Sequence, residues 1–176
     1  MDGYEHYFEP IIPDYIWYIC LAIVSIVSLM SVVFCTCRRD AFKWVVASVL
    51  LAYLILVYCN TVFLRVSLEE TKYELTLFWS YTTEDFKVQF IGNVLNIVLF
   101  APIGFLFKFL FKNQKCWIVI FLAFCISASI ESLQLIMKRG VCEFDDMLHN
   151  TFGALIGFLF AVKANKFIYN SPQLSS

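Results

Sequence analysis

Residues 131–157, ESLQLIMKRGVCEFDDMLHNTFGALIG, decide the fold that the sequence predicts. This stretch ends one apolar run and begins the next, and a short turn that holds Lys138, Arg139 and Gly140 joins the two runs. A chain that turns back at this point brings the polar groups at both junctions together in space. Those groups are Glu131 and Gln134 in the first run, and Asp145, Asp146 and Asn150 in the second.

The composition around this stretch is that of a membrane protein. Of the 176 residues, 61% are hydrophobic and 15% are charged, and the mean hydropathy is +0.76. Soluble domains carry about 25% charged residues and confine apolar side chains to one face of each helix. The net charge of -1 also argues against a nucleic-acid-binding protein, which needs a basic surface.

Five apolar segments are long enough to cross a bilayer as helices, which takes about 17 to 25 residues of low polarity. They are residues 16–35, 45–64, 90–111, 117–137 and 147–162, of which the last is the shortest. No other part of the sequence is large enough for a soluble domain. We therefore predict an all-α integral membrane bundle of about five transmembrane helices, built as a single domain over residues 1–176.

The positions of Lys and Arg predict the orientation of this bundle, because positive charge beside a span favours the cytoplasmic side. The opposite side receives every acidic residue except Asp40. We therefore predict an amino terminus outside the cell and a carboxyl terminus in the cytoplasm, which an odd number of spans also requires. The basic residues that mark the cytoplasmic side are Arg38, Arg39, Lys43, Lys108, Lys112, Lys115, Lys163 and Lys166.

The predicted third span carries two asparagines on one face. Asn93 and Asn96 are three residues apart, and Asn96 lies about 10 Å from the outer end of the span at 1.5 Å per residue. Pro102 and Gly104 follow, and a proline tends to kink a helix and so to open space beside Asn96. The alternative is that both amides only hold helices together, at about 1 kcal/mol each.

In the predicted fourth span, Glu131 and Gln134 share one face with Ser127. An ionised carboxylate about 10 Å below the outer end must find a partner or take up a proton. Lys138 and Arg139 are the candidate partners, and such a pair would give Glu131 a structural role. Without a partner, Glu131 would suit proton transfer.

In the predicted fifth span, Asp146, Asn150, Gly153 and Gly157 lie on one face. The two glycines form a small-xxx-small pattern, which lets another helix approach closely. This pattern predicts a homo-oligomer or another helix partner. Helix capping accounts for one of Asp145 and Asp146, because a helix amino terminus stabilises negative charge.

The sequence holds no metal or cofactor motif. His149 and Glu143 lie near the aspartates and make a metal site conceivable, but their spacing matches no metal signature. Seven cysteines, an odd number placed mostly within apolar runs, argue against a disulfide framework. We predict no metal, no cofactor and no nucleic-acid partner.

The polar side chains of the last three spans all fall in the outer halves of those spans. This asymmetry predicts a recess that opens to the extracytoplasmic surface or the outer leaflet, with Arg139 at its rim. Acids and amides beside a basic residue suit a hydroxylated or sugar-like headgroup whose apolar tail lies in lipid. The predicted ligand-binding residues are Asn93, Asn96, Glu131, Gln134, Arg139, Asp146 and Asn150, and the predicted helix-packing residues are Pro102, Gly104, Gly153 and Gly157.

Two stretches resemble the VanZ-like family of bacterial membrane proteins, namely NIVLFAPIGFLF at 96–107 and ESLQLIMKRGVCEFDDMLHNTFGALIGFLFA at 131–161. The resemblance covers the third to fifth spans, residues 90–162. It implies a multi-pass protein of the bacterial cytoplasmic membrane, related to one associated with resistance to teicoplanin and similar lipoglycopeptides. It does not imply a catalytic activity. The residues that match the signature are Asn96, Phe100, Pro102, Gly104, Glu131, Gln134, Arg139, Asp146, Asn150, Thr151, Gly153 and Gly157.

The leading hypothesis is a membrane protein that binds an envelope lipid or amphiphile in the outer recess and thereby lowers susceptibility to teicoplanin-like lipoglycopeptides. Glu131 and Asp146 would supply acceptor charge, the amides hydrogen bonds, and Arg139 a contact to phosphate. A membrane-embedded enzyme acting on a lipid-linked substrate ranks second, because no nucleophile or phosphate-cradling motif supports it. A structural or assembly partner of other membrane proteins is the third reading.

Overall fold

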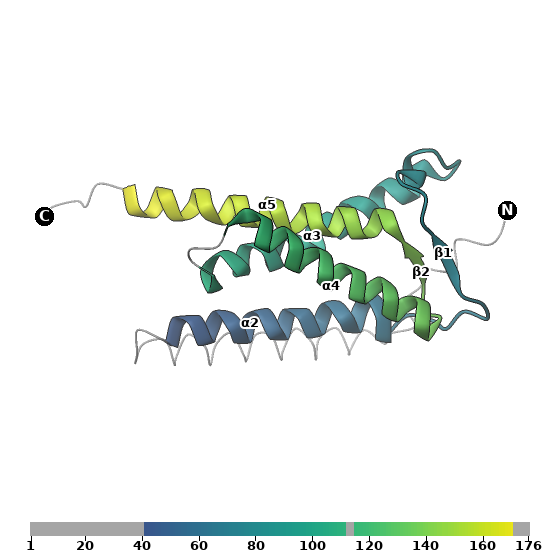
Figure 1. The fold of residues 1–176 in the computed structure, drawn as a ribbon, viewed down its shortest axis with the longest axis horizontal. Helices are drawn as coiled ribbons and strands as arrows, with labels where there is room; N and C mark the ends of the chain where they lie inside the picture. Colours follow the sequence, from purple (N-terminus) through teal and green to yellow (C-terminus); the bar gives the residue numbers. More distant parts are fainter. Residues whose placement is uncertain (1–40, 112–114, 171–176) are drawn as a thin grey trace, which may run out of the picture.

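The computed structural model describes residues 41–111 and 115–170, and these form a bundle of four long helices with a small sheet at one end (Figure 1). In Figure 1, α3 and α4 lie between α5 and α2. A π-helical turn, η2 (Cys59–Phe63), extends α2. The helices are α2 (Ala41–Tyr58), α3 (Phe86–Leu110), α4 (Cys116–Met137) and α5 (Phe144–Asn170).

All four helices are long and apolar enough to cross a membrane, with mean hydropathies between 1.3 and 2.2 over their best windows. The prediction of an all-α multi-pass membrane protein is therefore confirmed for the described residues. The predicted span 16–35 lies outside them. The last span is longer than predicted, because α5 begins at Phe144 rather than at 147. Its first turn contains two aspartates, whose charge a helix amino terminus favours but a hydropathy criterion rejects.

Three glycines let α3 and α5 pack with their backbones in contact. A Cβ on Gly157 would lie 2.7 Å from the carbonyl carbon of Ala101 and closer still to its oxygen, and Gly153 faces Ile97 in the same way. From the other side, Gly104 of α3 faces the backbone of Ala154. The helix that packs against the glycines of α5 is thus α3 of the same chain.

Pro102 lies inside α3, which continues as one helix from Phe86 to Leu110. The turn before the proline receives an extra hydrogen bond, because the hydroxyl of Tyr53 on α2 donates to the carbonyl oxygen of Leu99 at 2.9 Å. This bond ties α2 to α3 where the proline removes a backbone donor.

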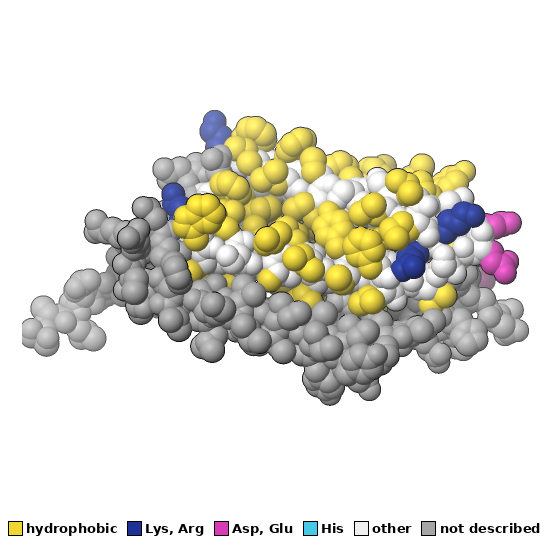
Figure 2. Space-filling view, turned by 90° about the horizontal axis from the view of Figure 1, so that it is seen from below, with side chains coloured by type: hydrophobic (Ala, Val, Ile, Leu, Met, Phe, Trp, Pro, Cys, Tyr) yellow, Lys and Arg dark blue, Asp and Glu magenta, His cyan; other side chains and the backbone are white. Residues whose placement is uncertain are grey.

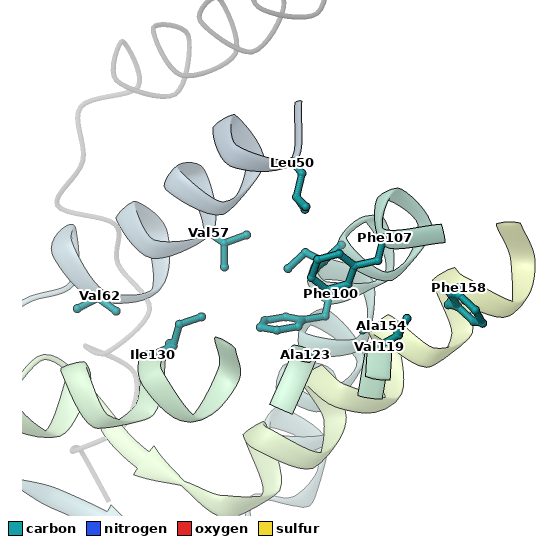
Figure 3. Close-up of a cluster of buried hydrophobic side chains, with 11 residues drawn as sticks. Leu50, Val57, Val62, Phe100, Phe107, Val119, Ala123, Ile130, Ala154 and Phe158 are labelled. Carbon is teal, nitrogen blue, oxygen red and sulfur yellow. The ribbon is translucent and has the colours of Figure 1, made fainter. Parts of the chain in front are cut away.

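The interior of the bundle is apolar away from the sheet end (Figure 3). Phe100 of α3 is fully buried and belongs to a cluster with Val57 of α2, Ala123 of α4 and Ala154 of α5. The outside is apolar as well, since Trp44 is 75% exposed and Ile136 is 76% exposed. Figure 2 shows the consequence on one face, where hydrophobic side chains form a band and charged side chains stand only at its two ends. A surface of this kind suits lipid rather than water.

The connection between η2 and α3 folds over one end of the bundle instead of forming a plain loop. Its strand β1 (Lys72–Glu74) pairs in parallel with β2 (Val141–Glu143), which joins α4 to α5. A short 3-10 helix, η3 (Trp79–Tyr81), follows β1. The sequence analysis did not predict these strands, because three residues are too few to show the alternation typical of a strand.

Candidate functional site

The sheet end of the bundle brings together polar side chains from three helices. We call this group the polar cluster. It lies directly beneath β1, β2 and η3, at the end of the bundle where all the acidic residues of the described part of the chain stand. Its members are Asn96 of α3, Glu131 and Gln134 of α4, Glu143 of β2, and Asp146 and Asn150 of α5.

Glu131 is the most deeply placed carboxylate of the polar cluster, with 1% of its surface exposed. Its Oε2 atom accepts a hydrogen bond from the backbone N–H of Glu143 at 3.0 Å. The Asp146 carboxylate lies within electrostatic reach. The face of α4 that carries Glu131 is therefore hydrogen-bonded to β2. This contact holds the end of α4 against the start of α5.

The two basic residues of the turn do not pair with Glu131 as the sequence suggested. The Lys138 ammonium donates to the carbonyl oxygen of Glu69 at 3.2 Å. The Arg139 guanidinium donates to the carbonyl oxygen of Phe63, at the end of η2. The Lys138 side chain thus holds the loop that follows η2, and the Arg139 side chain binds the end of η2, where free carbonyl groups attract cations.

Arg65 supplies the positive charge that acts on the carboxylates instead. Its charge acts on Glu131, Glu143 and Asp146. Its Nη1 atom lies 2.7 Å from the point where Gly140 would carry a Cβ, and Gly140 has a φ of 131° that L side chains rarely adopt. Sequence reasoning missed Arg65, because nothing in its spacing says toward which side chain a loop residue points.

The amides of the polar cluster connect the helices but leave acceptors unused. Gln134 is 2% exposed, and its Nε2 donates to the carbonyl oxygen of Thr61 at 2.9 Å. Asn150 is 4% exposed, and its Nδ2 donates to the Ser127 hydroxyl at 2.8 Å. Gln134 Oε1 and Asn150 Oδ1 are buried without a hydrogen-bond partner. Buried polar atoms in this state are rare and point to an absent donor.

Asn96 of α3 and Asp146 of α5 lie toward each other within the polar cluster. Both side chains are half-buried. On the β2 side, the indole N–H of Trp79 is buried without a hydrogen-bond partner and lies toward the Glu143 carboxyl. The structure thus turns the polar atom of Trp79 inward.

Asp145 belongs to a second hydrogen-bond network, which we did not predict from the sequence. The residue is fully buried, and its carboxylate accepts hydrogen bonds from the backbone N–H groups of Phe78 and Ser80, at 2.7 and 3.1 Å, and from the Ser80 hydroxyl at 2.6 Å. Asn93, a predicted ligand-binding residue, donates to that same hydroxyl at 3.0 Å. Asn93 therefore supports η3 from below rather than joining the polar cluster.

His149 is engaged at both ring nitrogens. Nδ1 lies 2.6 Å from the carbonyl oxygen of Asp145, and Nε2 lies 2.7 Å from the Tyr81 hydroxyl. The contact with Tyr81 leads to η3, so His149 helps to hold the segment 65–85 on the bundle. The metal site considered for His149 and Glu143 would compete with these contacts.

The recess expected from the sequence is covered at its inner part. Glu131, Gln134 and Asn150 lie in the interior, while Glu143 and Asp146 keep partial exposure. The segment 65–85, which we call the cover, lies over this part. A surface hollow of about 410 Å³ opens on this cover and is lined by residues of the cover, between Ser67 and Lys72.

The Glu143 carboxyl is the titratable group of the polar cluster that lies outside the predicted spans. Its pKa is raised to about 8, first by burial and then by the charge of Asp146, while Arg65 opposes the shift. A carboxyl with a higher pKa in the folded than in the unfolded state binds its proton more tightly when folded. Its effect on stability is therefore most favourable at low pH and is lost as the pH rises from near 4.5 toward 8.

Glu143→Gln should flatten this loss. We expect the apparent melting temperature of the purified protein in detergent to fall less between about pH 5 and pH 8 in the variant than in the wild type. Glu74→Gln is the matched control, because Glu74 pairs with Glu143 in the sheet register, but hydrogen bonds from Thr76 lower its pKa. Equal pH slopes for wild type and Glu143→Gln would contradict the assignment.

The comparisons with known proteins give one family. A family model described as VanZ/LLP1 matches residues 16–166, which is most of the chain. No curated protein and no solved structure matches the chain. The resemblance noted over residues 90–162 therefore extends into the first two predicted spans.

Proposed function

The chain belongs to the VanZ/LLP1 family, and from that premise we propose that it binds the headgroup of an envelope lipid or another amphiphile at the polar cluster. The observation that carries this proposal is a group of buried acids and amides, two of whose acceptor atoms have no partner, at one end of an otherwise apolar bundle. Ionisable side chains at membrane depth are costly and mark functional sites by default.

We place this site at the extracytoplasmic side of a bacterial cytoplasmic membrane. Every acidic residue of the described part of the chain stands at the sheet end, whereas the opposite end carries Lys43, Lys108, Lys115 and Lys163 and no acid. By the positive-inside rule, the basic end is cytoplasmic. The carboxyl end of α5 is then cytoplasmic, and the amino terminus is outside if residues 16–35 form a fifth span.

Entry of a headgroup requires the cover to move. The segment 65–85 is held by a strand pair of only three residues, by the hydrogen bonds to Asp145, and by the contact of Lys138 with Glu69. Local opening of a small exposed element costs less than global unfolding. The headgroup then lies against Glu131 and Asp146 while its tail stays beside the apolar helices.

The biological consequence that we propose is lower susceptibility to teicoplanin-like lipoglycopeptides, which follows from the family resemblance. These antibiotics are amphiphiles that act at the outer surface of the membrane. A protein that engages an amphiphile in the outer leaflet has the means to change their access to the envelope.

Glu131→Gln and Asp146→Asn should abolish this phenotype in a drug susceptibility assay while the amount of protein in the membrane stays normal. Each change keeps the shape of the side chain but removes one charged acceptor, which contributes about 1.5 to 3 kcal/mol to a hydrogen bond. Glu84→Gln is the control, because Glu84 is exposed and lies on the same side of the bundle. Full activity of both variants would show that the polar cluster is not the working site.

A further inference from the structure

The polar cluster has more acceptors than donors. It contains the carboxylates of Glu131 and Asp146. Glu143 is excluded from this balance because its raised pKa favours the protonated form and the Trp79 indole N–H lies toward it, and Asp145 is excluded because its own hydrogen bonds satisfy it. The two unpartnered amide atoms, on Gln134 and Asn150, are also acceptors, and both side chains are more than nine-tenths buried. A ligand that completes this site must therefore bring hydrogen-bond donors, and a positive charge would offset the carboxylates.

Arg65 now provides positive charge from the surface. The side chain is exposed, yet its Nη1 atom and Gln134 Oε1 both lie within 3.0 Å of the point where Gly140 would carry a Cβ. The guanidinium of this loop residue therefore lies near the buried amide group of Gln134. Gly140 has no side chain, so the guanidinium of Arg65 occupies the space beside the polar cluster where a Cβ would lie.

We propose that the polar cluster binds a primary ammonium group, with Glu131 and Asp146 as counter-charges and the free oxygens of Gln134 and Asn150 as further acceptors. Arg65 holds this place until the ligand displaces it. An ammonium group is a compact cation with three donors and no acceptor, which matches the balance of the site. The inference rests on the proposed function and names the chemical class of its ligand.

A phosphate at the same place would give the opposite result. It would bring negative charge beside the carboxylates, and it would need Arg65 as its partner. The two ligands therefore predict effects of opposite sign for the removal of Arg65. The loss of Arg65 strengthens ammonium binding by removing a competitor, and it weakens phosphate binding by removing a ligand-binding residue.

The test uses the full-length protein in nanodiscs and native mass spectrometry of retained lipid. The probes are phosphatidylethanolamine, phosphatidylcholine and phosphatidylglycerol with the same acyl chains, of which only the first carries a primary ammonium. We expect Arg65→Gln to raise the retention of phosphatidylethanolamine severalfold, and Glu131→Gln to lower it about tenfold or more. Lys87→Gln, which removes an exposed cation on the same side, should change nothing.

Several outcomes separate this inference from the proposed function. Retention of phosphatidylglycerol in preference to phosphatidylethanolamine, or loss of phosphatidylethanolamine in Arg65→Gln, would overturn the ammonium assignment and leave lipid binding intact. Lipid retention that is the same in Glu131→Gln as in the wild type would overturn both.

Free ethanolamine is the last probe. If it displaces the lipid, the ammonium group alone is recognised, and if it does not, recognition also requires the rest of the lipid. Arg65→Lys keeps the charge and should therefore retain less phosphatidylethanolamine than Arg65→Gln.

Discussion

Gly157→Ala should lower the stability of the protein by about 3 kcal/mol, near the upper end for overpacking. The added Cβ would lie 2.7 Å from the carbonyl carbon of Ala101 and closer still to its oxygen, so α5 must move away from α3. Backbone atoms do not give way as the end of a flexible side chain does. We expect the apparent melting temperature in detergent to fall by about 6 to 12 °C.

Two further variants show whether the effect comes from the helix contact. Gly104→Ala should cost as much, because it meets the backbone of Ala154 from the other helix. Gly92→Ala is the control, since a Cβ there meets nothing within 4 Å and alanine favours a helix over glycine by about 1 kcal/mol. If Gly157→Ala melts like Gly92→Ala, α3 does not pack on the glycine face of α5.

Asp145→Ala is the second large change, and we expect it to cost about 3 kcal/mol and to loosen the cover over the polar cluster. The carboxylate accepts hydrogen bonds from the backbone N–H groups of Phe78 and Ser80 and from the Ser80 hydroxyl. Removing a buried acceptor leaves these donors unsatisfied, at about 1 to 3 kcal/mol for each buried group. The segment 65–85 should then become sensitive to protease in the folded protein.

The control for this prediction is Asp85→Ala. Asp85 precedes α3 and makes no side-chain capping hydrogen bond, so its loss should leave the cover in place. Limited proteolysis of right-side-out vesicles would report the difference. Equal cleavage of wild type and Asp145→Ala within residues 65–85 would mean that Asp145 does not anchor the cover.

The sequence predicted the helices and the polar faces well, because both depend on local periodicity. The predicted spans 45–64, 90–111 and 117–137 differ by a few residues from those of the structure. Spacings of three and four placed Glu131 with Gln134, and Asp146 with Asn150, and a turn between two antiparallel helices can only bring these pairs to the same end. The helical hairpin thus follows from residues 131–157.

The cover could not be predicted in the same way. Its contacts depend on the path that a loop of more than twenty residues takes over the bundle, and no periodicity in the sequence predicts that path. Arg65 therefore escaped notice, and Arg139 received a ligand-binding role although its guanidinium contacts the carbonyl oxygen of Phe63. Helix capping was expected for one of Asp145 and Asp146, but the Asp145 carboxylate binds the segment of Phe78 and Ser80, more than sixty residues away in sequence.

The central claim is that Glu131 and Asp146 form one site that holds an amphiphile. The most direct measurement is native mass spectrometry of the protein purified from its own membrane in mild detergent, compared with the double variant Glu131→Gln, Asp146→Asn purified in the same way. The account predicts a bound amphiphile of defined mass on the wild type and its loss from a double variant that keeps the wild-type melting behaviour. The same bound species in equal amount on a folded double variant would contradict it.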